Sequence, residues 1–175
     1  MSQVLVRPIP RDADLTALTH LIHAAYAPHT ASGLRFWGTH QTVEDTAKRL
    51  SLGDGLVAEV DGVVVGTITV RASQPNSPVP LYRAPEVRSF SQFAVDPRHK
   101  GTGIGLALHE AALALAASKG ASTMALDTAA PARNLIEMYK RWGYDVCGEC
   151  DWRPRTNFVS VLMRRAIPQA IGSSS

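Results

Sequence analysis

The stretch SQFAVDPRHKGTGIGLALHEAALALAASKGA, residues 91–121, predicts a strand, a glycine-rich turn and a long helix in immediate succession. Its first residues continue a run of apolar and aromatic side chains, which Asp96-Pro97 ends, as expected for a strand. Its second half is rich in Leu and Ala, and the helix predicted over 104–118 ends before Gly120. A strand and a helix joined by glycines are therefore expected near the middle of the chain.

The glycine-rich turn has the composition of an anion-binding loop. Gly101, Gly103 and Gly105 alternate behind Arg98 and Lys100. The first N–H groups of a helix have no partner within the helix, and the helix dipole adds partial positive charge there, so a phosphate is favoured. A turn that needed flexibility alone would require one glycine. Three glycines beside two basic residues therefore predict a pyrophosphate site.

Two common nucleotide-binding loops do not fit this spacing. A Walker loop requires Lys-Ser/Thr after its last glycine, and Leu106-Ala107 occupy that place. A Rossmann turn requires Gly-x-Gly-x-x-Gly, and Leu106 replaces its third glycine. A Rossmann turn also usually opens its domain, whereas this one follows about 95 residues of other structure. A Rossmann-type nucleotide-binding protein is therefore the weaker alternative.

The remaining sequence predicts one mixed α/β domain. Strands are expected at 3–9, 87–95, 122–128, 145–152 and 156–166, a hairpin at 55–73 that turns at Asp61-Gly62, helices at 12–27, 42–52 and 132–144, and loops at 28–41 and 74–86. Thr42 and Asp45 have nearly the spacing and chemistry of a capping box. This order of elements indicates a single domain over residues 1–167, with a Ser-rich tail at 168–175 that we expect to be disordered.

Composition and charge narrow the class of protein. The 175 residues are enough for one domain with a buried core, and a net charge of +3 suits an anionic ligand but is too small to indicate nucleic-acid binding. No signal-peptide core and no run of about 18 apolar residues is present, so we expect a cytoplasmic protein without membrane contact. Cys147 and Cys150 lack a following helix and nearby further ligands, which favours structural cysteines over a redox pair or a metal site.

Residues 91–121 resemble motif A of the GNAT superfamily of N-acetyltransferases, whose pattern is Gln/Arg-x-x-Gly-x-Gly/Ala. Downstream, ARNLIEMYKRWGYDV (132–146) resembles motif B of that family, an Asn followed by a Tyr-x-x-x-Gly-Phe/Tyr run. Motif A is matched by Arg98, Gly101 and Gly103, and motif B by Asn134, Tyr139, Gly143 and Tyr144. The order of elements agrees as well, so the resemblance covers nearly the whole chain. It implies a single-domain GNAT fold, α/β, with a central mixed, mostly antiparallel sheet flanked by helices.

The resemblance also implies acetyl-CoA as co-substrate and no metal. In that family the pyrophosphate of acetyl-CoA lies on the amides of motif A, and its pantetheine pairs like an extra strand with the end of the preceding strand. The matching residues here are Phe93, Ala94, Val95, Arg98, Lys100, Gly101, Thr102, Gly103, Ile104 and Gly105, with Asn134 and Tyr139 from motif B. An N–H near the end of the strand would polarise the thioester carbonyl.

The implied reaction transfers an acetyl group from acetyl-CoA to an amine of a small molecule or peptide, by direct attack in a ternary complex. Family members often use a motif B tyrosine to protonate the leaving sulfur, and the matching residue is Tyr139. Leu135, Met138, Tyr139 and Trp142 also form an ordinary helical core stripe. Core packing and catalysis are compatible, because a buried tyrosine can still present its hydroxyl.

The base that deprotonates the amine has no clear candidate in the sequence. Ser89, Ser91, Phe93 and Val95 are expected to share one face of the strand, where relatives often carry an acidic residue. Glu86, just before the strand, is a weak candidate, and a water molecule held by Ser89 or Ser91 is an equal alternative.

The acceptor site is expected to involve the loop at 28–41, with Phe36 and Trp37, and Tyr82 from the proline-rich loop. Both aromatic residues of the first loop could equally dock onto the core. No acidic or basic cluster is visible in the sequence, so the acceptor stays open, as does the choice between a monomer and a homodimer. A non-catalytic acyl-CoA-binding module of the same fold is the second alternative.

Overall fold

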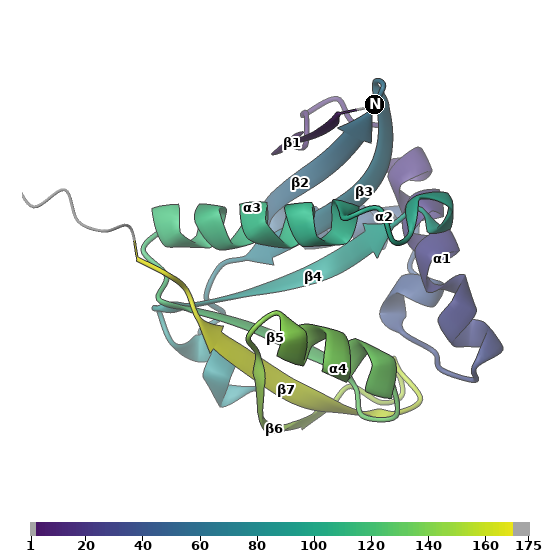
Figure 1. Ribbon diagram of the computed structural model, residues 1–175. Coiled ribbons are helices and arrows are strands. Elements are labelled where there is room, and N and C mark those ends of the chain that lie inside the picture. Colours follow the sequence, from purple (N-terminus) through teal and green to yellow (C-terminus); the bar gives the residue numbers. More distant parts are fainter. Residues whose placement is uncertain (1–2, 170–175) are drawn as a thin grey trace, which may run out of the picture.

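A twisted seven-stranded sheet forms the centre of the molecule in the computed structural model, which describes residues 3–169 (Figure 1). The strands, in spatial order, are β1 (Val4–Pro8), β2 (Gly53–Val60), β3 (Val63–Arg71), β4 (Val87–Val95), β5 (Thr123–Ala129), β7 (Val159–Ala166) and β6 (Asp145–Asp151). Neighbouring strands of this sheet are antiparallel except for β4 and β5, which are parallel. The mixed, mostly antiparallel sheet predicted from the sequence is confirmed.

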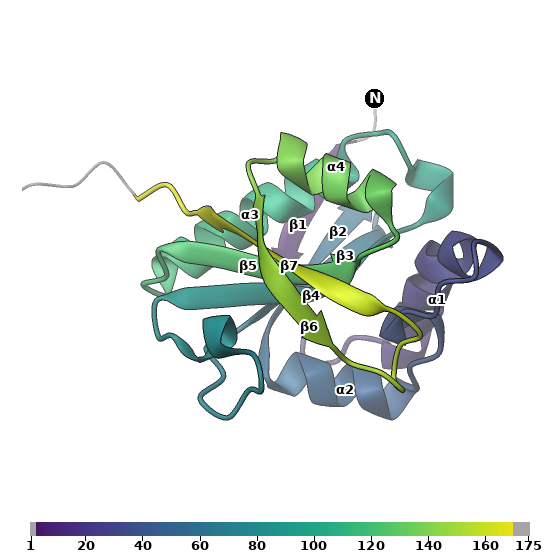
Figure 2. The same cartoon turned by 90° about the horizontal axis from the view of Figure 1, so that it is seen from below.

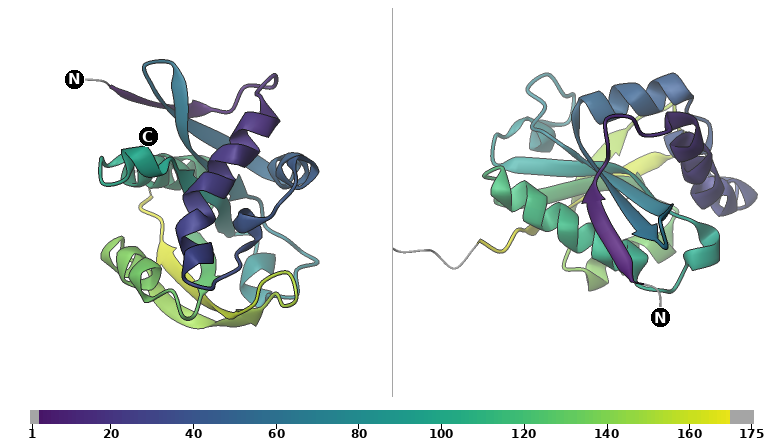
Figure 3. Two further views of the ribbon diagram at one scale, coloured as in Figure 1. Left: turned by 90° about the vertical axis from the view of Figure 1, so that its right-hand side faces the viewer. Right: turned by 90° about the horizontal axis from the view of Figure 1, so that it is seen from above.

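Helices cover both faces of the sheet (Figures 2 and 3). Their bounds are α1 (Leu15–Ala31), α2 (Val43–Ser51), α3 (Ile104–Ser118) and α4 (Arg133–Arg141), and short 3-10 turns occur at Trp37–Thr39, Pro80–Arg83 and Pro97–His99. The α3 and α4 helices pack on one face, and α1 and α2 on the other. None of the helices within residues 3–169 has the length and apolar character needed to cross a membrane.

The main core lies between α3 and the strands β2 to β5. Ile104, Leu108, Ala112 and Ala116 repeat at four-residue intervals along α3 and are at most 1% exposed. The helix approaches β3 closely at Gly66, where an added Cβ atom would lie 2.8 Å from Leu108 Cδ1. This packing fixes the start of α3, and with it the glycine-rich turn, against the sheet.

Two local predictions hold at atomic detail. The Thr42 hydroxyl accepts a hydrogen bond from the Asp45 N–H, and the Asp45 carboxylate accepts one from the Thr42 N–H, which completes a capping box at α2. Asp61 and Gly62 both have positive φ, 52° and 81°, as the tight hairpin turn between β2 and β3 requires.

The first helix differs from its predicted bounds of 12–27. It begins at Leu15 because the Asp14 side chain caps it, accepting a hydrogen bond from the Ala17 N–H at 3.0 Å. It continues through Pro28, which is exposed, to Ala31. The loop predicted at 28–41 therefore contributes a final helical turn.

The parallel pair β4 and β5 is joined over three residues of each strand, from Val87 to Ser89 and from Thr123 to Ala125. Beyond these residues the two strands diverge, and Figure 1 shows the resulting V-shaped gap in the middle of the sheet. A bulge at Gln92, whose φ is +50°, adds one residue to β4 opposite β3 and bends β4 away. The gap opens on the side where the glycine-rich turn lies.

The end of the chain is described as far as Gln169. Ile167 is buried against the main core, whereas Pro168 and Gln169 have no regular secondary structure. Most of the tail predicted at 168–175 lies outside the described residues, so its disorder stays a prediction.

Candidate active site

The glycine-rich turn presents the start of α3 without a side-chain cap. Gly101 and Gly103 have φ values of 79° and 85°, in the left-handed region that side chains with a Cβ atom rarely adopt. Gly103 is the N-cap residue, and no side chain accepts a hydrogen bond from the first turn. The free N–H groups and the helix dipole at this point fit a phosphate group.

Gly105 differs from the other two glycines because it lies inside the first turn of α3. A Cβ atom there would lie 3.5 Å from Phe93 Cζ and 3.9 Å from Trp142 Cη2, which is ordinary van der Waals contact. Neither backbone strain nor a clash therefore requires glycine. Its effect is to leave space beside Phe93, at the end of β4, where the gap opens.

The two basic residues of the turn have different environments. The Arg98 guanidinium pairs with Asp96 through two contacts of 3.2 and 2.8 Å, and this pairing holds the pKa of the Asp96 carboxyl below its usual range. Lys100 is exposed and forms no ion pair with another described residue. Burial lowers the pKa of His29 at the end of α1, and the nearby Lys100 charge lowers it further. Lys100 is thus the freer cation beside the gap.

A cleft of about 390 Å³ joins the gap between β4 and β5 to the face of the sheet that α1 and α2 cover. It is lined from β4 by residues 89–93, from β5 by residues 126–128, and otherwise by side chains from α1, α2, α4 and the loops around them. Its volume is within the range of small-molecule sites.

All three residues predicted for the acceptor site line this cleft. Phe36 is partly buried against Phe158, at 4.8 Å between ring centroids, so it also docks onto the core. The Trp37 indole lies between the guanidinium groups of Arg49 and Arg155, which are 4.2 and 4.1 Å from its ring centroid.

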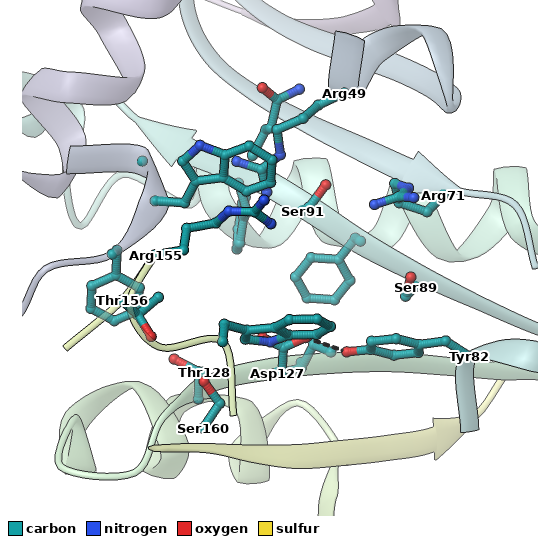
Figure 4. A pocket seen from close by; sticks show the side chains of 18 of the residues that line it. Arg49, Arg71, Tyr82, Ser89, Ser91, Asp127, Thr128, Arg155, Thr156 and Ser160 are labelled. Carbon is teal, nitrogen blue, oxygen red and sulfur yellow. Dashed lines mark hydrogen bonds between the residues drawn. The ribbon is translucent and has the colours of Figure 1, made fainter. Parts of the chain in front are cut away.

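Tyr82 and Trp152 hold a carboxylate in the floor of the cleft. The Tyr82 hydroxyl donates a hydrogen bond to Asp127 Oδ2 at 2.5 Å, and Trp152 Nε1 donates one to Asp127 Oδ1 at 3.0 Å (Figure 4). Burial raises the pKa of Asp127, although the two hydrogen bonds and the charges of Arg49 and Arg71 act in the opposite direction. Among the described residues that line the cleft, Asp127 alone is acidic.

Three arginines converge on the cleft from separate segments: Arg49 from α2, Arg71 from the end of β3 and Arg155 from the loop before β7. Arg49 donates to Gln41 Oε1 at 2.8 Å, but the buried Nε atoms of Arg49 and Arg71 have no hydrogen-bond partner within the described chain. Burial lowers the pKa of Arg49 to about 10 and also lowers that of Arg71. No described carboxylate forms an ion pair with any of the three, so they are available to an anionic ligand.

Tyr139 reaches the cleft from α4. Its ring is 7% exposed and packs against Phe90, Trp142 and Tyr144 at centroid distances of 5.7 to 5.9 Å. Burial raises the pKa of its hydroxyl well above the ordinary value, so the phenol stays protonated at neutral pH. The residue therefore combines a place in the core with a place in the lining of the cleft.

Two predicted site residues lie elsewhere. Glu86 is exposed at the closed end of the gap, where its backbone carbonyl accepts hydrogen bonds from the N–H groups of Ser122 and Thr123. Asn134 is exposed in the first turn of α4. Neither residue lines the cleft. Glu86 precedes the strand segment that diverges, whereas Asn134 was predicted to contact acetyl-CoA, and that role stays a prediction.

The prediction that Ser89, Ser91, Phe93 and Val95 share one face of β4 is wrong. The bulge at Gln92 inserts one residue, so the alternation of side chains reverses there. Ser89 and Ser91 line the acceptor cleft, whereas Phe93, which borders the cleft as well, contacts the start of α3 together with Val95. The Ser91 hydroxyl is buried and has no hydrogen-bond partner within the described chain.

The two cysteines lie on β6 and are not bonded to each other. Cys147 is exposed and Cys150 is partly buried beside Tyr82. Burial raises the pKa of both thiols, to about 12 for Cys150, so neither is an activated thiolate. Within residues 3–169 no three His, Cys, Asp or Glu side chains gather as metal ligands. The structural role predicted for the cysteines stays a prediction.

The sequence contains little that would have revealed the arginines or Asp127. The arginines are separated by at least 22 positions, and each stands in an otherwise ordinary helix, strand or loop. Asp127 interrupts the apolar run of β5, and an acidic residue within a buried strand is the one sequence feature that pointed toward a site.

A split parallel strand pair, an uncapped helix start beside it and an adjoining cleft with charged side chains fit an acyl-CoA-dependent acyltransferase. The model of the acetyltransferase (GNAT) family matches residues 18–144, and the chain belongs to this family. The chain is 34% identical over 161 residues to the S-(2-succino)cysteine N-acetyltransferase of Bacillus subtilis (strain 168), which covers 91% of this chain and 93% of the relative. The expected N-acetyltransferase class is confirmed.

Solved structures agree on the fold. The ribosomal-protein-S18-alanine N-acetyltransferase of Escherichia coli has a TM-score of 0.72 at 16% identity, covering 99% of both chains. The yncA protein of Salmonella typhimurium, solved with its cofactor acetyl-CoA, has a TM-score of 0.68 at 20% identity, and the match again covers 99% of each chain. The GNAT fold expected from the sequence is confirmed, and the family uses acetyl-CoA as acetyl donor.

Proposed function

We propose that this enzyme acetylates the amino group of a small amino acid with several carboxylates, of the S-(2-succino)cysteine type. The observation that carries the proposal is the convergence of three guanidinium groups, from Arg49, Arg71 and Arg155, on a cleft that contains one carboxylate, Asp127. Lys48 lines the cleft as well, and S-(2-succino)cysteine, with three carboxylates and one ammonium group, matches this excess of positive charge and the single carboxylate.

The desolvation of the arginines favours such an acceptor. Buried cations without a partner cost desolvation free energy, and a carboxylate that hydrogen-bonds to them recovers it. The unpartnered Nε atoms of Arg49 and Arg71 are donors of this kind. A neutral acceptor or a polyamine would leave these donors unpaired or add like charge, and is therefore disfavoured.

The relative from Bacillus subtilis supports the same acceptor class, since its name gives S-(2-succino)cysteine as substrate and the match spans nearly the full length of both chains. The cleft of about 390 Å³ also suits a small molecule better than a protein surface. A cytoplasmic location and a monomeric or homodimeric state stay predictions.

For acetyl-CoA we propose the turn and gap described above. The uncapped N–H groups between Gly101 and Gly105 suit the pyrophosphate, with Lys100 adding positive charge. The unpaired edge of β4 at Phe93, Ala94 and Val95 suits the pantetheine, because its backbone groups face the gap. Arg98 is a weaker contact than expected, since Asp96 engages it.

For the chemistry we propose direct attack of the amine on the thioester, with Tyr139 as general acid. Its hydroxyl is protonated at neutral pH, as that of an ordinary tyrosine is, and it can donate this proton to the sulfur as negative charge develops there when the C–S bond breaks. Its place in the cleft lining, next to residues of β4 and β5, suits that role.

The test is a panel of acceptors assayed with acetyl-CoA by release of free thiol. S-(2-succino)cysteine is compared with S-butylcysteine, which has a similar length and no succinate carboxylates, and with a short peptide. We expect kcat/KM for the first to exceed that for the second by at least about 100-fold, given charged hydrogen bonds worth roughly 1.5–3 kcal/mol each. Equal rates for S-butylcysteine, or preference for the peptide, would exclude the proposed acceptor class.

A further inference from the structure

We infer that Asp127 is the catalytic base of this enzyme: its carboxylate binds the ammonium group of the acceptor and takes a proton from it, while Tyr82 and Trp152 hold the carboxylate in position. The inference requires acetyl transfer to an amine, but it does not require the acceptor to be a polycarboxylate. It supplies the base for which β4, with serines at 89 and 91, offers no carboxylate.

The position of Asp127 follows from the division of the sheet. Pairing of β4 and β5 ends at Ser89 and Ala125, and Asp127 is two residues further along β5. Side chains two apart on a strand share a face, so Asp127 lies on the same face as Ala125, and Ser91 is its counterpart on β4. The carboxylate therefore stands where the gap proposed for the donor meets the acceptor cleft.

The hydrogen bonds of Asp127 leave room for a substrate. Tyr82 donates to one carboxylate oxygen and Trp152 to the other, at 2.5 and 3.0 Å. Each carboxylate oxygen can accept two hydrogen bonds, so one site on each oxygen remains for an ammonium group. Because the two donors come from different segments, they fix the plane of the carboxylate from both sides.

The charges of the cleft orient the acceptor. Figure 4 shows Arg49, Arg71 and Arg155 above the cavity and Asp127 with Tyr82 below it. An ammonium group is repelled by the guanidinium groups and attracted by the carboxylate. The amine is therefore drawn to the floor of the cleft, beside the gap, whatever groups occupy the side of the arginines.

The proton affinity of Asp127 suits a base. Burial raises the pKa of its carboxyl, which strengthens it as a proton acceptor, while the hydrogen bonds from Tyr82 and Trp152 and the charges of Arg49 and Arg71 act in the opposite direction. The titratable and charged groups around it are Arg49 on α2, Arg71 on β3, Tyr82 in the turn before β4, Tyr26 on α1, Tyr139 on α4 and Cys150 on β6. Burial raises the pKa of the three tyrosines and of the thiol, so these groups do not titrate with it near neutral pH.

The protons balance over the reaction. Asp127 takes the first proton from the ammonium group, and the free amine forms the C–N bond to the acetyl carbon. When the C–S bond breaks, the sulfur receives the hydroxyl proton of Tyr139, and Tyr139 recovers a proton from the same nitrogen. Asp127 then releases its proton to water, so that amide, free thiol and one proton leave the site.

The first test replaces the carboxylate by its amide. Asp127→Asn keeps both hydrogen bonds, because the amide oxygen accepts from Trp152 and the Tyr82 hydroxyl can accept from the amide N–H. We expect kcat/KM to fall by about 10²- to 10⁴-fold and the acidic limb of its pH profile to disappear. Asp145→Asn, an exposed carboxylate at the start of β6, is the matched control and keeps full activity. Retention of activity and of the acidic limb by Asp127→Asn would overturn the inference.

A second measurement separates this inference from the proposed acceptor. The acceptor analogue without an amine, 3-mercaptopropionate carrying the 2-succino group on sulfur, is assayed as an inhibitor. It should inhibit Asp127→Asn as well as it inhibits the wild type, since it has no ammonium group. Failure of the analogue to inhibit the wild type would count against a polycarboxylate acceptor. Loss of turnover in Asp127→Asn with every active amine would still support Asp127 as the catalytic base.

A third variant tests positioning and guards against misfolding of the first. Tyr82→Phe removes one donor to the ionised carboxylate, so the pKa of Asp127 should rise and the acidic limb of the profile should move to higher pH. A merely structural role for Tyr82 would lower activity equally at all pH values, and that result would exclude it as a positioning residue.

Ser91→Ala, by contrast, should leave the acidic limb of the pH profile of kcat/KM at the same pH. A loss of the acidic limb in Ser91→Ala would favour a serine-held water as the base and overturn the assignment to Asp127.

Discussion

Arg71 shows how one side chain at the end of a strand can define an acceptor. Residues 65–70 of β3, which precede it, are all buried. The strand ends at the half-buried guanidinium of Arg71, whose Nε has no partner within the described chain. Such a group is costly in the free protein and is expected only where a ligand compensates it. Arg71 therefore lowers the free energy of unfolding of the free protein while it favours an acidic acceptor.

The consequence can be tested with Arg71→Met. KM for S-(2-succino)cysteine should rise by roughly 10- to 100-fold, because one charged hydrogen bond is lost, while the rate with S-butylcysteine should not change. The free energy of unfolding should stay the same or increase, since a buried unpaired cation is removed. Steady-state kinetics and urea denaturation measure the two effects, with Arg164→Met on the exposed side of β7 as control. An unchanged KM for the acidic acceptor would contradict the role given to Arg71.

Tyr139 can be tested by removal of its hydroxyl alone. Tyr139→Phe should lower kcat by about 100-fold or more, because the leaving sulfur loses its proton donor. The unfolding transition should hardly move, since the ring keeps its contacts with Phe90 and Trp142. Turnover of the variant at the wild-type rate would show that Tyr139 only packs the core.

At the scale of elements, the three glycines of the glycine-rich turn have two different structural roles. Gly101 and Gly103 have left-handed backbones, whereas Gly105 is helical and keeps space open beside β4. The alternation that is visible in the sequence therefore has two physical causes. The first sets the course of the backbone, and the second sets the shape of the gap.

Gly103→Ala should strain the backbone at the start of α3, at a cost of about 1–2 kcal/mol in the free energy of unfolding. It should also raise KM for acetyl-CoA, because the N–H groups of the first turn would be displaced. Gly120→Ala is a matched control: it has a φ of +87° at the other end of the same helix, with nothing within 4 Å of an added Cβ. Both variants should lose similar stability, and the KM for acetyl-CoA should change in Gly103→Ala alone. Equal effects on KM would mean that the turn acts only through stability.

At the scale of the whole molecule, the cleft depends on contacts between segments about 120 residues apart. Asn157 donates to the carbonyl of Gly33 at 2.9 Å and accepts from the N–H of Arg35 at 2.8 Å, and His40 bonds to the carbonyl of Arg155 at 3.1 Å. These bonds hold the loop with Trp37 against the loop with Arg155. The guanidinium of Arg155 is placed over the cleft by this pairing.

Asn157→Ala should therefore loosen one side of the acceptor site without touching the donor site. We expect KM for the acceptor to rise several-fold and KM for acetyl-CoA to stay constant, since each exposed hydrogen bond contributes only about 1 kcal/mol. Initial rates with each substrate varied in turn measure the two constants. A parallel rise in both would indicate a general loss of structure instead.

The sequence predicted most of the fold because its determinants are local. The capping box at Thr42, the turn at Asp61-Gly62 and the apolar period of α3 act within a few residues, and each is present in the structure. The predictions failed where tertiary contacts or backbone irregularity intervened. The bulge at Gln92 reversed the faces of β4, and α1 continued past Pro28 to Ala31.

The sequence by itself determined the donor side of the enzyme: a strand, a turn with Gly101 and Gly103, and a helix whose first N–H groups stay free. Those groups are neighbours along the chain, so their spacing fixes their geometry. Only the tertiary structure decided the acceptor side. Asp127 and the arginines become neighbours because the sheet splits between β4 and β5 and separate segments close over the split. Charges that meet across a fold leave no periodic pattern in a sequence, and here they define the substrate that we propose.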